Sequence, residues 1–338
     1  MKNMPIPLSV LDQSPVVPGA TPGDAIRATI ELARVAEALG YHRFWLAEHH
    51  SMGVLADPSP EILLARITGE TSRIRIGTGG VLLPHYRALK VAEQFRALEA
   101  LAPGRIDLGI GRAPGGMQLV SKALGSFDVS EFPQQVNDLV NFLDGTIPTD
   151  HRFAKLRAMP DGCTAPDVWL LGSSDYSAML AAEMGLPFAF AHFISGNAPE
   201  VTRMYRRNFR PSSRSAVPRV LLAMSALVGD TPEAAETFGK FNDFVRLRIR
   251  HGIDKPPASL QEALEYQYTF DERAEVAFIR YRTMIGTAGT VRRQIEDVTT
   301  LHHADEAMIV SILPDYKSRL RSYELLAQAF ALPEALAS

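Results

Sequence analysis

Short apolar runs in this chain of 338 residues end in polar or glycine residues. If the runs are parallel strands of one barrel, their ends are where chemistry is expected. The residues at these ends are Glu48, His49 and His50 after the run 43–47; Thr78, Gly79 and Gly80 within 74–83; Gly111 and Arg112 at the end of 106–111; Gly172, Ser173 and Ser174 at the end of 168–172; and His192 after 188–191. Three of these sets point to one anion-binding site beside a flat ligand.

Arg112, Ser173 and Ser174 indicate the anion site. Arginine offers a fixed fork of donors that suits phosphate. The two serines supply hydroxyls just before a predicted helix, whose free N–H groups also favour an anion. The adjacent Gly79 and Gly80 interrupt a strand, which is typical of close approach by a ligand or another backbone. A phosphorylated planar cofactor lying on the glycines, with its phosphate on the Arg112 and Ser173 side, satisfies all three observations.

Each feature also has a purely structural explanation. Arg112 could pair with a carboxylate at the strand ends, and the serines could serve only as a helix cap. The glycines could relieve crowding without any ligand. The position of the three sets on neighbouring strands favours the ligand site.

The pair His49 and His50 suggests a metal ligand or a proton-transfer group. Consecutive strand residues point to opposite faces, so only one of the two can readily face a site. A hydrolytic metal site would also need a His-x-His set and several carboxylates at strand ends, and neither occurs, so we expect no metal. Imidazole titrates near neutral pH and suits proton transfer; a histidine that only satisfies a hydrogen bond is the alternative. His302 and His303, late in a helix, are expected on the solvated surface.

The elements that would position these residues alternate between strand and helix. Eight apolar runs are predicted to be strands, at 6–11, 43–47, 74–83, 106–111, 168–172, 188–191, 220–228 and 307–313. The first helix begins with Thr21, Pro22 and Asp24, which are a capping residue, a proline and an acid, and it stops at Gly40. Eight strands separated by helices predict an α/β fold, a (β/α)8 TIM barrel that spans 1–338 as a single domain.

One segment does not fit a minimal barrel. Residues 229–286, after the seventh strand, contain a helix start at Thr231 and Pro232 and a break at Pro256 and Pro257. An insertion of this length at the C-terminal face is a candidate lid over the site. The loop 113–130 is a second candidate wall.

The composition excludes several classes of protein. With 35 Lys and Arg residues against 38 Asp and Glu, the formal charge is −3, which gives no broad attraction to nucleic acid or to an anionic membrane. The single cysteine, Cys163, excludes an intrachain disulfide and a cysteine-based zinc cluster. No apolar run is long enough to span a membrane and no signal peptide is evident, so a cytoplasmic location is expected.

Four segments resemble the bacterial-luciferase-like monooxygenases, and most of all their single-chain flavin oxidoreductase branch. The segments are WLAEHHS at 45–51, GTGGVLLPHY at 77–86, PGRIDLGIGRAPGG at 103–116 and LGSSDYSAMLAAEMGLPFAFAHF at 171–193. The similarity extends from LDQSP at 11–15 to the closing helix and is weakest across 229–286.

The resemblance implies a barrel that binds reduced flavin mononucleotide (FMN) or, in some branches, the deazaflavin coenzyme F420. It implies that His49 is the catalytic histidine, that Arg112 holds the flavin phosphate, and that a cis peptide bond joins Gly79 to Gly80 behind the flavin ring. Gly111 stands where luciferases carry a cysteine, which argues against light emission from a long-chain aldehyde. A homodimer through the helices beside the second and third strands is also implied. The full set of cofactor-binding residues is then Thr78, Gly79, Gly80, Gly111, Arg112, Gly172, Ser173 and Ser174.

We therefore expect a two-component monooxygenase that oxidises a small organic substrate with reduced FMN and O2 through a flavin hydroperoxide. A separate flavin reductase would supply the reduced FMN, because GIGRAP at 109–114 breaks the dinucleotide-binding Gly-x-Gly-x-x-Gly pattern at its last position. Gln13, Ser14 and His192 are the candidate substrate residues. The alternatives are a coenzyme F420-dependent dehydrogenase on the same barrel, a non-catalytic flavin-binding protein and, more distantly, a metal-dependent hydrolase.

Overall fold

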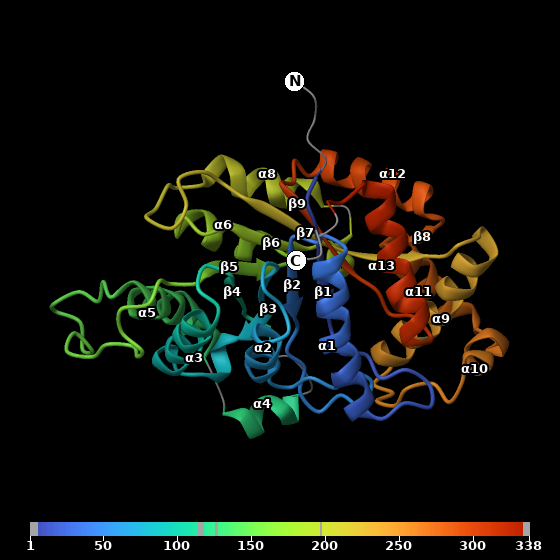
Figure 1. Cartoon of the computed structure of the whole chain (residues 1–338), viewed down its shortest axis with the longest axis horizontal. Coiled ribbons are helices and arrows are strands. Elements are labelled where there is room, and N and C mark those ends of the chain that lie inside the picture. The colour runs from blue at the N-terminus through green and yellow to red at the C-terminus, as the bar shows by residue number, and fades with distance from the viewer. Residues whose placement is uncertain (1–5, 114–117, 126–127, 197, 334–338) are drawn as a thin grey trace.

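The computed structural model describes residues 6–113, 118–125, 128–196 and 198–333 (Figure 1). Among these residues nine strands form one parallel sheet. They are β1 (Leu8–Asp12), β2 (Arg43–Leu46), β3 (Arg75–Leu82), β4 (Ile106–Gly111), β5 (Asp167–Gly172), β6 (Phe188–Ala191), β7 (Val220–Val228), β8 (Thr283–Gly286) and β9 (Glu306–Val310). The sheet closes because β6 pairs with β7, β7 with β9 and β9 with β1. Strands β1 to β7 and β9 therefore make the predicted TIM barrel.

Helices surround this barrel (Figure 1). They are α1 (Pro22–Ala38), α2 (Pro60–Thr68), α3 (Ala88–Leu101), α4 (Gln118–Leu124), α5 (Phe132–Asp144), α6 (Asp175–Glu183), α7 (His192–Ser195), α8 (Pro199–Asn208), α9 (Pro232–Arg250), α10 (Leu260–Glu265), α11 (Phe270–Tyr281), α12 (Ala288–Leu301) and α13 (Tyr316–Phe330). The start of α1 confirms the predicted cap. The Thr21 hydroxyl accepts from the Asp24 N–H at 3.2 Å, and the Asp24 carboxylate accepts from the Thr21 N–H at 2.9 Å.

The barrel strands are buried on both faces. Phe44 packs outward with the helices, whereas its neighbour Trp45 points into the barrel with Trp169 and Met308. This alternation follows from the period of two along a strand. The rings of Trp45 and Trp169 meet edge to face with their centroids 5.6 Å apart, which fills the middle of the barrel.

A buried charge network closes the N-terminal end of the barrel. The Arg43 guanidinium donates to Asp107 at 2.8 Å and to Glu306 at 2.7 Å, and all three side chains are buried. Trp45 Nε1 donates to the same Asp107 carboxylate at 2.9 Å. Each buried charge therefore has an opposite charge and further hydrogen bonds, as such groups require. This floor leaves the C-terminal end open, which is the end where TIM-barrel active sites lie.

The insertion 229–286 contains α9, α10, α11 and β8, which lie together at one side of the barrel (Figure 1). Strand β8 was not predicted. The pairing of β7 with β6 ends at Ala223 and its pairing with β9 ends at Ser225, so the last residues of β7 have free backbone groups. The four residues of β8 pair with them. A strand this short within an insertion carries no clear sequence signal.

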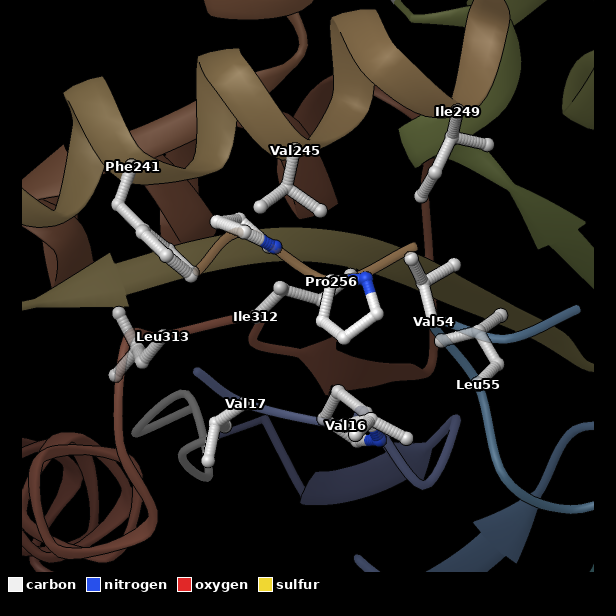
Figure 2. Close-up of a pocket in the computed structure, with 12 residues that line it drawn as sticks. Val16, Val17, Val54, Leu55, Phe241, Val245, Ile249, Pro256, Ile312 and Leu313 are labelled. Carbon is white, nitrogen blue, oxygen red and sulfur yellow. The ribbon is translucent and has the colours of Figure 1, made fainter. Parts of the chain in front are cut away.

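An apolar contact holds α9 against the barrel (Figure 2). Phe241, Val245 and Ile249 recur every fourth residue and so share one face of the helix. Figure 2 shows these side chains over aliphatic side chains from three loops that follow barrel strands, namely Val16, Val17, Val54, Leu55, Ile312 and Leu313. Packing of this kind fixes where the neighbouring polar residues of α9 lie.

Candidate active site

A cavity of about 580 Å³ lies among the C-terminal ends of the barrel strands. This volume is typical of a site for a small molecule or cofactor. Trp45, Leu221 and Met308 supply part of its apolar lining. The predicted site residues that line it are Gln13, His49, Gly79, Gly80, Gly111, Arg112, Gly172, Ser173 and Ser174. Residues far apart in the chain thus meet at one place, because they follow neighbouring strands.

Three predicted site residues do not line this cavity. Thr78 alternates with Gly77 and Gly79 along β3, so its side chain is buried on the other face and its hydroxyl donates to the Gly109 carbonyl at 2.9 Å. The Ser14 hydroxyl lies 2.9 Å from Thr29 Oγ1 of α1. His192 begins α7 and is buried. The predicted ligand contacts of Thr78, Ser14 and His192 therefore find no support in their positions.

His302 is also placed differently from the prediction. Its imidazole is buried and packs on His192, with ring centroids 5.8 Å apart, and on Phe190 at 5.5 Å. Its Nδ1 lies 3.4 Å from Thr202 Oγ1 of α8. The end of α12 is covered by α8, a contact between distant segments that the local sequence does not reveal. His303 is exposed, as predicted.

The guanidinium of Arg112 has no carboxylate partner within the described ranges. Its Cζ lies 4.1 Å from the centroid of the Tyr176 ring of α6, so the side chain rests on an aromatic face. The alternative that Arg112 only pairs with a carboxylate is therefore excluded for this part of the chain. An unpaired guanidinium lining a cavity is suited to bind an anion.

Ser173 and Ser174 lie beside Arg112 in the cavity lining. Ser174 is the N-cap residue of α6, and its N–H donates to Ser177 Oγ at 3.4 Å. The Ser173 carbonyl accepts from the Ser195 hydroxyl at 2.8 Å, which holds the loop in place. The capping explanation thus holds for Ser174, but the N-terminus of α6 also opens toward the cavity lining. Its free N–H groups and the serine hydroxyls add to the anion-binding character of Arg112.

Glycines form the wall beside this anion site. The peptide bond between Gly79 and Gly80 is cis, as predicted. A Cβ at Gly80 would lie 2.6 Å from the Gly109 carbonyl oxygen, so this position needs glycine. A Cβ at Gly79 would lie 2.7 Å from the end of the Leu11 side chain, which would have to shift. A Cβ at Gly111, in contrast, would meet no atom within 4 Å. The side chain missing at Gly111 therefore leaves room in the cavity for a ligand that approaches the backbone, and the residues fit a phosphorylated flat cofactor.

His49 lines the cavity and His50 does not. The Glu48 carboxylate accepts from the Tyr86 hydroxyl and from His50 Nε2, both at 2.6 Å, which turns His50 toward the end of β3. The His49 N–H donates to the Asp57 carbonyl at 3.1 Å. The loop that carries His49 is thus fixed from both sides, and one histidine of the pair, His49, faces the cavity.

The electrostatics around His49 favour a neutral imidazole. Burial, together with the positive charge of Arg246 and the neighbouring His50, lowers the pKa of His49 to about 4. Within the described residues, His49 Nδ1 and the carboxamide oxygen of Gln13 are buried without hydrogen-bond partners. Both side chains line the cavity, so His49 is available to accept a proton from a ligand and Gln13 to accept a hydrogen bond.

Asp57 behind this loop makes stability depend on pH. Burial and, to a smaller extent, the charge of Asp12 raise the pKa of the Asp57 carboxyl, and the hydrogen bond from the Ser59 N–H opposes them. The net result is a pKa of about 7. The folded state therefore holds a proton that the unfolded chain releases at pH 4 and above, and the free energy of unfolding falls between about pH 4 and pH 7.

We expect Asp57→Asn to remove this loss. Its free energy of unfolding at pH 8 should exceed that of the parent by roughly 2–4 kcal/mol, since one pKa unit is worth about 1.4 kcal/mol. Urea unfolding from pH 4.5 to pH 8 measures the effect, with the exposed Asp150→Asn as the control. If the free energy of unfolding depended on pH in the same way for Asp57→Asn and the parent, the raised pKa of Asp57 would be contradicted.

Phe193 and Arg246 were not predicted as site residues. His192 was predicted after β6, but the next residue, Phe193, is the one that lines the cavity. Within the described ranges no group of three or more His, Cys, Asp or Glu side chains is arranged to hold a metal ion. In the same ranges, helices with the length and apolar character of a membrane span are absent.

The chain belongs to the luciferase-like monooxygenase family, which matches residues 6–303. It is 46% identical over 331 residues to YwcH of Bacillus subtilis (strain 168), an uncharacterised protein, covering 96% of this chain and 99% of that one. It is 37% identical over 331 residues to a luciferase-like monooxygenase of Escherichia coli (strain K12), and the match covers 96% of this chain and 97% of that one. The crystal structure of apo-MsnO8 superposes with a TM-score of 0.90 at 40% identity, covering 98% of this chain and 99% of that chain.

More distant structures share the fold alone. The oxygenating constituent of 3,6-diketocamphane monooxygenase from Pseudomonas putida, solved with FMN, has a TM-score of 0.70 at 17% identity and covers 99% of this chain and 100% of that one. An F420-dependent secondary alcohol dehydrogenase has a TM-score of 0.66 at 15% identity, and the match covers 97% of this chain and 99% of that one. The same barrel thus occurs with FMN and with F420.

Proposed function

We propose that this protein is a two-component flavin-dependent monooxygenase that oxidises a small organic substrate with O2 and reduced FMN. The observation that carries the proposal is the Arg112 guanidinium, which has no carboxylate partner among the described residues and lies beside Ser173 and Ser174 at a cavity with a glycine wall. Reduced FMN, when bound, supplies the two electrons that leave one oxygen atom of O2 in the product and the other in water. Membership of the monooxygenase family supports this choice of reaction.

Each part of the cavity has a role in this proposal. Arg112 and the N-terminus of α6 bind the phosphate, and Gly79, Gly80 and Gly111 let a flat ring approach the backbone. The neutral His49 accepts a proton at Nδ1 or donates a hydrogen bond from its other nitrogen. The apolar lining and the insertion at the open end exclude water, which protects reactive species from side reactions.

A dehydrogenase that uses coenzyme F420 is the second candidate. It is favoured by the F420-dependent enzyme on the same barrel and by a phosphate site that would suit either cofactor. Such an enzyme transfers a hydride without O2, so activity under argon separates the two functions. A non-catalytic flavin-binding protein would bind flavin tightly and show no substrate-dependent O2 consumption.

An anaerobic titration with reduced FMN, with F420 in parallel, tests the proposal. We expect saturable binding of reduced FMN, followed by the transient absorbance of a flavin hydroperoxide when air is admitted. The reduced form is used because two-component enzymes can bind oxidised flavin poorly. Preference for F420 would favour the dehydrogenase, and binding of neither cofactor would overturn both functions.

A separate flavin reductase and a homodimer complete the proposal. The helices beside β2 and β3 leave large apolar side chains exposed, namely Ile62 of α2 at 66% and Leu101 of α3 at 61%. Such side chains are candidates for burial between two copies. Sedimentation equilibrium distinguishes the dimer from a monomer. The need for a separate reductase is tested by measuring whether O2 consumption requires an added NADH-dependent flavin reductase.

A further inference from the structure

Arg246 on α9 differs from Arg248 and Arg250, the next two arginines of this helix, in its charge pairing. Arg248 pairs with Glu262 at 3.1 Å, and Arg250 pairs with Glu275 at 3.0 Å. The Arg246 guanidinium makes no hydrogen bond or ion pair with any described residue, and its Cζ lies 6.0 Å from the centroid of the Phe193 ring. The residue is nevertheless partly buried. A partly buried charge without a counter-charge calls for an explanation, because removing an unpaired charge from water is costly.

Arg246 is next to the lining of the active-site cavity without being part of it. Phe193, the ring that it contacts, lines the cavity, and so does His49, whose pKa the charge of Arg246 helps to lower. The packing of Val245 onto the barrel loops fixes this stretch of α9 (Figure 2). The two arginines contact different aromatic rings, since Arg246 faces Phe193 and Arg112 rests on Tyr176 of α6.

The nearby charges do not neutralise Arg246. The charge that acts on Arg246 is that of Arg282, which is also positive and repels it. The Arg282 guanidinium donates to the carbonyl of Ile194 of α7, a residue of the cavity lining. The neighbouring carboxylates Asp243 and Glu236 both pair with Arg280 instead. Burial, and then the charge of Arg282, lower the pKa of Arg246 to about 10, so Arg246 is still a cation at neutral pH.

We propose that Arg246 binds the carboxylate of the substrate, so that the substrates of this enzyme are small apolar organic acids. One guanidinium offers a two-pronged donor that matches one carboxylate. The apolar lining contributed by Phe193, Ile194 and Leu221 suits the rest of such a molecule. This inference rests on the proposed function, since it names the substrate class of the same site.

Calorimetric titration with hexanoate, and with hexanamide as its uncharged match, tests the inference. We expect the parent protein to bind hexanoate at least about ten-fold more tightly than hexanamide, the worth of a charge-assisted hydrogen bond. Arg246→Met keeps the apolar stem and should abolish this preference while leaving hexanamide binding unchanged. Arg246→Lys should retain part of it. Arg250→Met, which removes a paired arginine of the same helix, should bind both probes as the parent does.

Equal binding of the two probes by the parent, no binding of hexanoate, or an unchanged preference in Arg246→Met would each overturn the inference. Thermal melting of each variant shows that the comparison is made between folded proteins. The titrations are run with and without FMN. A protein that prefers the acid but does not bind reduced FMN would refute the proposed function and leave the Arg246 site standing, so the two failures are distinguishable.

Discussion

Replacing His49 by alanine is expected to lower the turnover number by roughly 10²–10⁴-fold, the usual contribution of a general acid or base. The affinity for reduced FMN should stay unchanged, because the predicted phosphate contacts lie on Arg112, Ser173 and Ser174. The physical reason is that His49 Nδ1 is buried in the cavity without a partner among the described residues, and burial keeps the ring neutral. O2 consumption, on the substrate that a screen of small organic acids identifies, measures the effect.

The exposed His251 on the insertion provides the matched control, and His251→Ala should turn over as the parent does. A second readout is independent of activity. NMR titration of the flavin-free parent should show His49 with a midpoint near its lowered pKa of about 4, with the resonance assigned by its absence from the His49→Ala spectrum. A turnover number equal to that of the parent, or titration near pH 6.5, would rule out the role of His49 as a neutral acceptor.

Arg112→Ala should weaken the binding of reduced FMN by roughly 10–150-fold, which corresponds to about 1.5–3 kcal/mol for a charge-assisted hydrogen bond. The loss is expected because no described residue would take over the role of this unpaired guanidinium. Anaerobic titration of the parent and the variant gives the two dissociation constants. Riboflavin, which lacks the phosphate, should bind the two proteins equally well.

Arg152 is a suitable control for this experiment. It also rests on an aromatic ring, 4.6 Å from the centroid of Phe153, but it lies away from the cavity lining. Arg152→Ala should therefore bind reduced FMN as the parent does. Equal FMN affinity in Arg112→Ala and the parent, or an equal loss for riboflavin, would show that Arg112 does not hold the phosphate.

Local sequence signals predicted the barrel and nine of the residues that line the cavity. Strands and helix caps depend on neighbouring residues, as at Thr21 and Asp24, so they can be predicted without the tertiary structure. A closed parallel barrel then brings the C-terminal ends of its strands to one face. His49, Arg112 and Ser173 could therefore be assigned to one site although they are distant in the chain.

Contacts between distant segments decided the rest. Whether Thr78 or Gly79 faces the cavity depends on the strand register, and a difference of one residue reverses the answer, as with His192 and Phe193. Burial of His302 requires α8, and β8 requires the free edge of β7. Arg246, Arg248 and Arg250 look alike in the sequence, and only the folded chain determines which of them has a carboxylate within reach. Charge pairing depends on distance in space, so the arginine without a partner could be recognised only in the tertiary structure.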